Sequence, residues 1–373
     1  MKKVIFDKLF TDIIVFFLIC SFTLTSIVWI LQAVNFLDIV SEDGHGLITY
    51  FSFTSLNIPK IFNKLMLLSI FLSIFYIISN YEEKNQLVIY WVNGVSKIKF
   101  LNRIITFSIL FLLISLSISY YVVPYTQNKA RSFIRSSNID FFPSLIKPRK
   151  FIDTVENFTI FLDDKNNKNI NKILIKDSSN NNNSQLIISK SGKIINNEKN
   201  KFLQLDKGVI INFNNDNLTS FNFKKTNIDL SQYQTKTTTA PKIQEIKSKN
   251  ITKCISLLLK DKNTKINISN LSCDSSFYKN LIQELYKRMI LPFYIPLLFI
   301  IATFLVLKSK NNLNYKYFKI KIFLLGILIV IFSQISVNLV SKNNFMTLIM
   351  IVAPLILILF SYLIFLNKAK SSS

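Results

Sequence analysis

Residues 13–31, IIVFFLICSFTLTSIVWIL, decide the fold class, because they form a run of nineteen residues without a charge. At a rise of about 1.5 Å per residue, a helix of this length crosses the roughly 30 Å hydrocarbon core of a bilayer. Asp7 and Asp12 precede the run, and the run is longer than the apolar part of a secretory signal. We therefore interpret it as a membrane span and not as a cleaved leader.

Five further apolar stretches predict five more spans, at residues 65–81, 104–123, 289–307, 322–340 and 345–366. A long polar interval separates the third stretch from the fourth. The sequence therefore predicts three helices, a large insert and three more helices, with domains at residues 1–123, 124–278 and 279–373.

The short loops carry a strong charge asymmetry, which predicts the orientation of the spans. Basic residues concentrate on one side of the membrane in this arrangement, and that side is normally cytoplasmic. The fourteen basic residues on that side are Lys2, Lys3, Lys8, Lys84, Lys97, Lys99, Arg103, Lys308, Lys310, Lys316, Lys319, Lys321, Lys368 and Lys370. We therefore expect a membrane protein with both termini in the cytoplasm and the large insert on the other side of the membrane.

The insert contains short β-branched and aromatic runs separated by polar residues. They lie at residues 158–162, 173–175, 186–188, 193–195, 202–205, 209–213 and 218–223, and we expect Gly192 and Gly208 to mark turns between strands. This spacing predicts an antiparallel sandwich or barrel. Residues 251–259 and 275–287 predict two helices that lead back to the membrane.

Cys254 and Cys273 both lie in the insert that we place outside the cytoplasm, where a disulfide can form. Their spacing gives no support for pairing, so we expect two free buried thiols and keep a disulfide as the alternative.

The composition argues against several classes of enzyme. The chain has six glycines and lacks a phosphate-binding glycine loop, and His45 is its only histidine. A histidine triad or a histidine-based metal site is therefore not expected, and His45 is interpreted as a loop residue. We predict a non-catalytic protein without a metal or cofactor. The net charge of +24 is assigned to membrane orientation and not to nucleic-acid binding.

Residues 82–97, EEKNQLVIYWVNGVSK, link the second and third spans, and we call them the coupling segment. Acidic residues at its start suit a helix N-terminus, and Gly94 suits a helix end. Its apolar side chains, Leu87, Val88, Trp91 and Val92, suit either a helix that lies on lipid or a helix that docks into a separate ATPase.

Three segments make the chain similar to the lipopolysaccharide export permeases of the LptF/LptG (YjgP/YjgQ) family. They are residues 28–40, which resemble the LptF branch most, the coupling segment up to Ser96, and residues 284–292, ELYKRMILP. The resemblance covers essentially the whole chain. It implies six transmembrane α-helices, three before and three after an inserted periplasmic antiparallel β-jellyroll.

The resemblance also implies a function and partners. It implies a multi-pass permease of the bacterial inner membrane, with both termini cytoplasmic and the large domain periplasmic. This permease takes lipopolysaccharide from that membrane, pairs with an LptG-like paralogue and is driven by an LptB-like ATPase dimer. LptC-like and LptA-like jellyroll proteins would continue the bridge towards the outer membrane. The alternative is a membrane-anchored β-domain that binds a cell-envelope ligand without transport.

Candidate site residues follow from this resemblance. For ATPase coupling they are Glu82, Glu83, Gln86, Leu87, Trp91 and Gly94; Gln86 stands where the family usually has a glutamate, so Glu82 or Glu83 is the alternative contact. For the lipid cavity and its lateral gate they are Ser26, Gln32, Lys60, Lys64 and Gln334. The two lysines would supply the positive charge that meets lipid phosphates.

Overall fold

The computed structural model describes most of the chain. The described ranges are residues 2–37, 46–136, 148–155, 158–166, 169–180, 183–196, 201–214, 217–229, 242–260, 266–268, 271–273, 277–340 and 344–371. His45 lies outside them. Contacts divide the chain into two compact units. Unit 1 consists of residues 1–31, 57–128 and 242–373, and unit 2 of residues 32–56 and 129–241.

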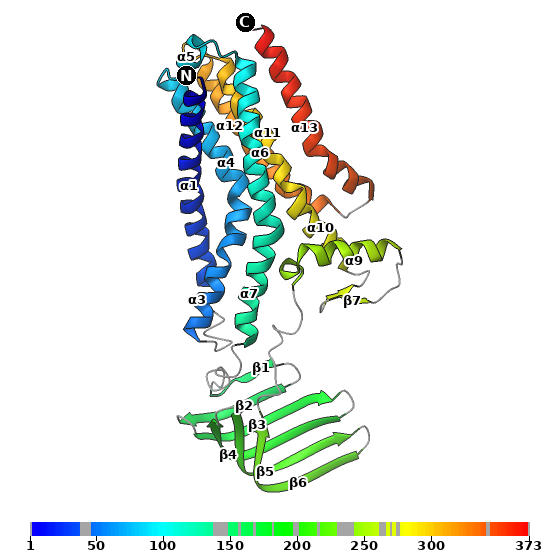
Figure 1. Ribbon diagram of the computed structural model, residues 1–373. Coiled ribbons are helices and arrows are strands. Elements are labelled where there is room, and N and C mark those ends of the chain that lie inside the picture. The colour runs from blue at the N-terminus through cyan, green and yellow to red at the C-terminus, as the bar shows by residue number, and fades with distance from the viewer. Residues whose placement is uncertain are drawn as a thin grey trace. The chain divides into compact units, whose positions relative to one another are not determined.

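Six helical stretches in the described residues are long and apolar enough to span a membrane, as the sequence predicts. They are built from α1 (Lys2–Asn35), α3 (Leu47–Leu56) with α4 (Ile58–Glu83), α6 (Lys97–Ser117) with α7 (Val123–Ser136), α10 (Tyr278–Met289) with α11 (Tyr294–Thr303), α12 (Tyr315–Leu339) and α13 (Asn344–Ser371). Both chain ends and the short helix α5 (Leu87–Val92) lie at the same end of unit 1 (Figure 1).

Helix α11 is the centre of the bundle. All ten of its residues are buried, and it packs against α4, α6, α12 and α13. Aromatic rings fill the contacts around it, including Phe111 on α6 against Phe299 on α11. The helices outside it carry many exposed apolar side chains, such as Phe22 on α1 and Leu328 on α12. A helix that is apolar all round, such as α11, is buried in the bundle. The exposed apolar faces of the surrounding helices are suited to contact with lipid or with a partner.

Close packing between α4 and α12 depends on Gly326. The ring of Phe71 occupies the space that a side chain at position 326 would need. Small residues of this kind let two membrane helices approach closely.

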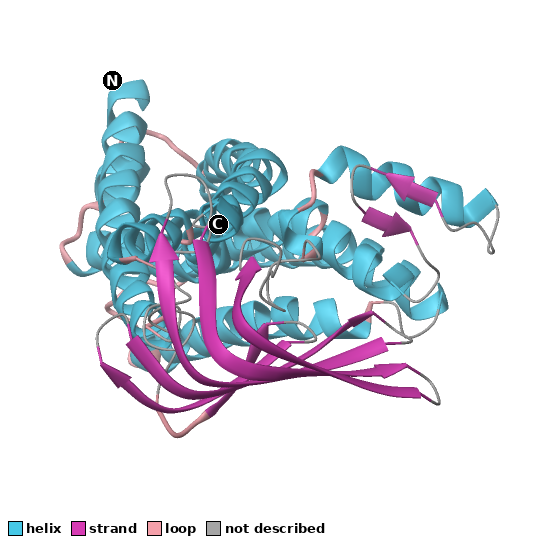
Figure 2. Ribbon diagram, turned by 90° about the horizontal axis from the view of Figure 1, so that it is seen from below, coloured by secondary structure: helices cyan, strands magenta, loops and turns pink. Residues whose placement is uncertain are grey.

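Unit 2 contains a six-stranded antiparallel sheet in which each strand pairs with the next (Figure 2). Its strands are β1 (Phe151–Val155), β2 (Phe158–Asn166), β3 (Asn169–Asn180), β4 (Asn183–Asn196), β5 (Lys201–Asn214) and β6 (Asn217–Asp229). The expected inserted antiparallel β-domain is therefore confirmed, and the order of its described strands is a meander. Phe158, Ile160, Leu162, Ile175 and Leu203 belong to its buried core.

The expectation that Gly192 and Gly208 mark turns between strands is wrong. Gly192 lies inside β4 and Gly208 inside β5, so four of the predicted short runs merge into two long strands. A side chain at either position would collide with a neighbouring strand, with the Gln204 carbonyl at Gly192 and the Ile188 carbonyl at Gly208. Glycine inside a strand often marks such a close approach of backbone, and it does so here.

Two helices lead back to the membrane, as predicted, in the form of α9 (Ser248–Lys260) and α10. The expectation of free thiols beside them is wrong, because Cys254 on α9 forms a disulfide with Cys273. The hairpin of β7 (Ile266–Ile268) and β8 (Leu271–Cys273) returns the chain to α9, so that the two Cα atoms lie 5.9 Å apart. Both cysteines are buried in one small core with Ile251 and Leu281.

We predict that only Cys20 reacts when the denatured protein is treated with a maleimide in the absence of reductant. Reduction before labelling should raise the number of modified cysteines from one to three, because the disulfide between Cys254 and Cys273 is then opened. Intact-protein mass spectrometry counts the added groups. Three modified cysteines without reductant would contradict the disulfide, and the Cys20→Ser variant is the control for the single label.

Candidate functional site

The coupling segment forms a short helix that is fixed to the bundle on one side. Leu87 and Tyr90 on α5 are buried, and the Tyr90 hydroxyl donates a hydrogen bond of 3.0 Å to the carbonyl oxygen of Ile5. Burial, with the charge of Asp12 nearby, raises the pKa of the Tyr90 phenol above its ordinary value. A tyrosine is protonated at neutral pH even without this shift, and the hydrogen bond that its hydroxyl donates holds the segment to α1.

The other side of α5 is exposed and apolar. Val88 and Ile89 are about half exposed, and Val92 is 80% exposed. Trp91 is half-buried and packs its ring against Phe100 of α6, at 5.9 Å between centroids. The apolar surface expected from the sequence is therefore divided: Leu87 belongs to the core, Trp91 lies at its edge, and the three β-branched side chains are free for a partner.

Glu82 binds the loop that precedes α12, and Glu83 binds α12 itself. The Glu82 Oε1 atom accepts a hydrogen bond of 2.8 Å from the backbone N–H of Lys310, and Glu83 Oε1 lies 2.6 Å from Lys319 Nζ. These two carboxylates therefore join the coupling segment to α12 at the end of the bundle that carries the termini.

Gln86 and Gly94 shape the two ends of α5. The backbone N–H of Gln86 donates to the Tyr81 carbonyl at 2.8 Å, and Gln86 precedes the first residue of α5. Gly94 ends the helix with a positive φ of 69°, a conformation that glycine adopts without strain.

The predicted cavity residues fall on three membrane helices. Ser26 and Gln32 on α1 and Gln334 on α12 are half-buried, and Gln32 belongs to unit 2. Lys60 and Lys64 lie one turn apart on α4. In the described part of the chain, the contacts bring Lys60 and Lys64 together but do not join either of them to Ser26 or Gln334.

Lys60 is surrounded by charges that the sequence does not place beside it. Its charge interacts with those of Lys64, Lys242 and Lys287 and, among the described residues, with the carboxylate of Glu284. We call the four lysines the basic cluster. Glu284 is at the same time paired with Arg288 at 3.0 Å, so that the cluster keeps an excess of positive charge suited to phosphate groups.

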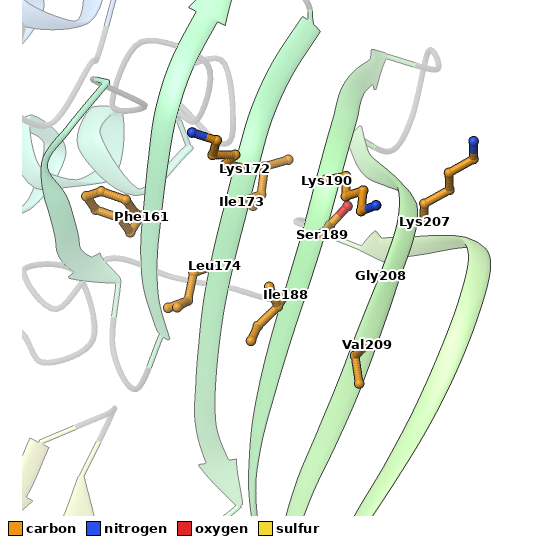
Figure 3. Close-up of a pocket in the computed structure, with 10 residues that line it drawn as sticks. All are labelled: Phe161, Lys172, Ile173, Leu174, Ile188, Ser189, Lys190, Lys207, Gly208 and Val209. Atoms are coloured by element: carbon orange, nitrogen blue, oxygen red, sulfur yellow. The ribbon is translucent and has the colours of Figure 1, made fainter.

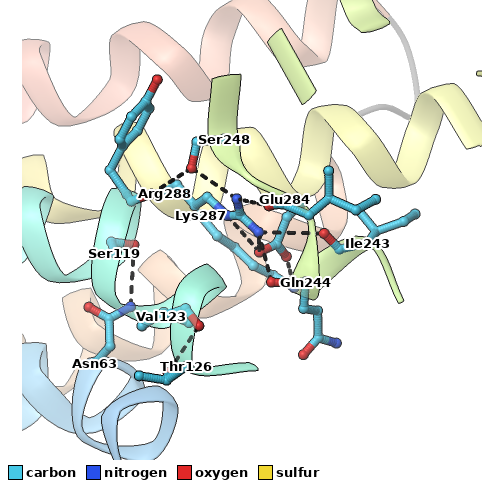
Figure 4. A network of polar contacts seen from close by, with 12 residues as sticks. Asn63, Ser119, Val123, Thr126, Ile243, Gln244, Ser248, Glu284, Lys287 and Arg288 are labelled. Carbon is cyan, nitrogen blue, oxygen red and sulfur yellow. Dashed lines mark hydrogen bonds and ion pairs between the residues drawn. The ribbon is translucent and has the colours of Figure 1, made fainter. Parts of the chain in front are cut away.

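Arg288 holds the chain that returns from the sheet to the membrane (Figure 4). Its side chain is 3% exposed, and its guanidinium donates to the carbonyl oxygens of Gln244 and Ile246 and to the hydroxyl of Ser248, at 2.8–3.0 Å. Ser248 in turn donates to the Tyr120 carbonyl at 2.7 Å. We call this set of contacts the Arg288 junction; the sequence motif at residues 284–292 marks its position but not its role.

Polar contacts also tie the third span to the second near this junction. The Asn63 side chain donates to the Ser119 hydroxyl at 3.3 Å, and Gln127 Nε2 donates to Asn57 Oδ1 at 2.9 Å. Ser119 belongs to a short π-helix, η1 (Ile118–Val122), between α6 and α7. Such interruptions within helices frequently accompany functional sites.

The sheet of unit 2 carries a shallow pocket of about 430 Å³ (Figure 3). Phe161, Leu174, Ile188 and Val209 are successive cross-strand partners on four strands and give it an apolar floor. Its rim carries three lysines, which are Lys172, Lys190 and Lys207. An apolar surface beside cationic side chains is suited to an amphiphile that bears phosphate.

We predict that Arg288→Met lowers the free energy of unfolding by about 3–5 kcal/mol, because it removes the closer of the two basic partners of the buried Glu284 carboxylate and the donor to the Gln244 and Ile246 carbonyl oxygens. Arg288→Lys should recover only part of this loss, since one ammonium group cannot reach all the acceptors. Thermal unfolding of the detergent-solubilised protein measures the change. The matched control is Lys287→Met on the same helix, because the half-exposed Lys287 side chain lies farther from Glu284, at 3.9 Å; equal destabilisation by the two methionine variants would contradict the structural role of Arg288.

Comparison with known proteins completes the description of the site. The family model described as lipopolysaccharide export system permease LptF/LptG matches residues 8–368. A protein of Rickettsia prowazekii (strain Madrid E), named "Uncharacterized protein RP871", is 26% identical over 221 residues, which are 59% of this chain and 61% of that relative. The alignment thus spans less than two thirds of the relative's length. With six candidate membrane helices and the inserted antiparallel sheet, the match along nearly the whole chain shows that the protein belongs to the LptF/LptG family of lipopolysaccharide export permeases.

Proposed function

We propose that this chain is a permease subunit that extracts lipopolysaccharide from the inner membrane and passes it to a periplasmic bridge of β-domains. The match of the family model to residues 8–368 carries the proposal. The similarity of residues 28–40 to the LptF branch favours the LptF place, with an LptG-like paralogue as the second half of the transporter. The termini and the coupling segment are cytoplasmic in this proposal, and the sheet is periplasmic.

Exposed apolar surface on α1 and α12 supports a second subunit and a lipid substrate. On α1 the buried stripe begins with large residues such as Phe6 and Phe17 and continues with the small polar residues Ser21 and Thr25. Beside this narrow stripe on α1, Phe22 is 73% exposed. On α12, Leu328 is 64% exposed. Helices with such flanks can line a cavity whose other wall is supplied by a paralogous permease.

The basic cluster supports a substrate that bears phosphate. Lys60 and Lys64 lie near the beginning of α4, and Lys242 and Lys287 approach them from the linker and from α10. We propose that these ammonium groups bind the phosphates of lipopolysaccharide while the acyl chains lie between the apolar helices. Attraction between fixed cations and a phosphate is strong where water is partly excluded.

The acyl chains of lipopolysaccharide need an apolar route from the membrane to the periplasmic bridge. Exposing an acyl chain of about ten methylene groups to water would cost about 8 kcal/mol, at about 0.8 kcal/mol for each group. The sheet pocket, with its apolar floor and lysine rim, provides a surface of matching chemistry. Sheet edges can also be extended by strand addition, which would continue the route into LptC-like and LptA-like partners.

Energy for extraction would come from a separate ATPase that docks on α5. The exposed side chains Val88, Ile89 and Val92 form the docking surface that we propose, and Glu82 and Glu83 transmit its movement to α12 through Lys310 and Lys319. The disulfide of Cys254 and Cys273 supports a location of the insert on the side of the membrane opposite to α5, because such bonds form in oxidising compartments.

We predict that Val92→Asp abolishes co-purification with an LptB-like ATPase in mild detergent while the protein remains inserted and folded. The charge would fall on the most exposed apolar side chain of α5 and would have to be desolvated at the interface. Leu218→Asp, at a 66% exposed position on β6, is the matched control. If the wild-type chain brings down neither an ATPase nor a paralogous permease, the non-transport alternative of a membrane-anchored β-domain is favoured.

We also predict that photocrosslinking amino acids placed at Ser26 and at Gln334 capture lipopolysaccharide in cells. A crosslinker at Leu359 on α13, which is 63% exposed, is the control for lipid in general and should capture phospholipid. Mass spectrometry of the adducts identifies the lipid. Adducts with phospholipid alone at all three positions would mean that Ser26 and Gln334 do not line a cavity for lipopolysaccharide.

A further inference from the structure

A second pocket, of about 470 Å³, lies in unit 1 where α6 passes through η1 into α7. Three tyrosines and two lysines dominate its wall: Tyr120, Tyr121, Tyr125, Lys247 and Lys249. We call it the tyrosine pocket. Its volume lies within the range of about 300–1,000 Å³ that is typical of small-molecule sites.

The Arg288 junction builds this pocket. Ser248 is 5% exposed, and its hydroxyl donates to the Tyr120 carbonyl while it accepts a hydrogen bond of 2.9 Å from Arg288 Nη1. The start of α9 is therefore fixed to η1, and Lys247 and Lys249 flank this fixed residue on either side. The positions of the two lysines at the pocket thus follow from buried hydrogen bonds.

The tyrosine pocket lies on a different face of the third span from the basic cluster. Ser119 and Gln127 turn towards Asn63 and Asn57 at the start of the second span, to which they are hydrogen-bonded. Tyr121 and Tyr125, in contrast, are 69% and 64% exposed. The pocket is therefore open to the surroundings of the bundle and not to the helix that carries Lys60 and Lys64.

Its position along the helix is at the boundary of the membrane. Tyr120 and Tyr121 lie in the last four residues of the apolar run 104–123, Tyr125 follows it, and tyrosine is enriched at the level of the lipid headgroups. The described lining residues include no carboxylate, so Lys247 and Lys249 give the pocket a positive charge. Headgroup phosphates lie at this level of a bilayer, and two lysines attract them.

We propose that the tyrosine pocket binds the phosphodiester headgroup of an anionic bilayer phospholipid as a site separate from that of the exported lipid. Lys247 and Lys249 contact the phosphate, and the tyrosine rings pack against the glycerol and the upper acyl carbons. A lipid bound there links the third span to the start of α9 and stabilises the side of the Arg288 junction that faces the membrane.

Native mass spectrometry of the full-length protein, purified with phosphatidylglycerol or with phosphatidylcholine, tests this proposal. We expect the wild type to retain phosphatidylglycerol more than phosphatidylcholine, and the Lys247→Gln/Lys249→Gln variant to lose roughly ten- to thirty-fold in retention of phosphatidylglycerol. The matched control is Lys316→Gln/Lys321→Gln, which removes two exposed lysines from α12 and should bind as the wild type does.

Further measurements distinguish a lipid bound in the tyrosine pocket from a free anion and from lipid bound elsewhere. An excess of inorganic phosphate should leave the bound lipid in place; displacement by phosphate would mean a site for a free anion and would overturn the proposal. If the Lys247→Gln/Lys249→Gln variant and the Lys316→Gln/Lys321→Gln variant retain equal amounts of phosphatidylglycerol, the bound lipid is adventitious lipid only, which would overturn the proposal. Tyr121→Ser should lower retention with both lysines intact, and an unchanged value would exclude the tyrosine wall. Because these measurements need neither an ATPase nor lipopolysaccharide, their outcome is independent of the proposed export function.

Discussion

The structure depends on one constraint, which is that a backbone inside hydrocarbon must satisfy its own hydrogen bonds. Helices meet this condition within a single segment, whereas the edges of an open sheet do not. The six apolar stretches are therefore helical, and the six-stranded sheet is confined to the insert between the third and fourth spans. The same constraint explains why α11 is buried on every side while α1 and α12 keep apolar flanks, since hydrocarbon receives such flanks at no cost. A bundle of this kind offers surfaces to a lipid and to a second membrane subunit, but little aqueous chemistry.

Polar contacts are placed at the two ends of this bundle, where they can transmit movement. At the end with the termini, Glu82 joins α4 to the loop before α12, and Glu83 joins it to Lys319 on α12. At the other end, the Arg288 junction joins α10 to the linker that comes from the sheet and, through Ser248, to η1. Helix α4 carries the two glutamates at one end and Lys60 and Lys64 near the other. In the function that we propose, a force applied at α5 therefore reaches the basic cluster through α4, and it reaches the linker through the buried helix α11 and α10.

Much of this architecture follows from the sequence, because hydrophobic length and β-branched runs report local structure directly. The spans, five of the six strands of the sheet and the helices that return to the membrane were predictable on that basis, whereas β1 was not predicted. Gly192 and Gly208 were not, since a glycine at a turn and a glycine beneath a neighbouring strand have the same local signal. The disulfide between Cys254 and Cys273 and the division of α5 into a buried and an exposed side depend on tertiary contacts. The basic cluster likewise joins residues from three separate segments, which charge spacing along one segment cannot reveal.

The central claim is that the sheet receives lipid on the side of the membrane opposite to both termini. Leu218→Cys on β6 and Lys84→Cys beside α5 place single exposed reporters on the two parts, since Cys254 and Cys273 are bonded and Cys20 lies within the first span. A membrane-impermeant maleimide applied to spheroplasts should label the protein with Leu218→Cys at once and the protein with Lys84→Cys only after lysis. Labelling of position 84 in intact spheroplasts, with position 218 protected, would place the sheet in the cytoplasm and contradict the account.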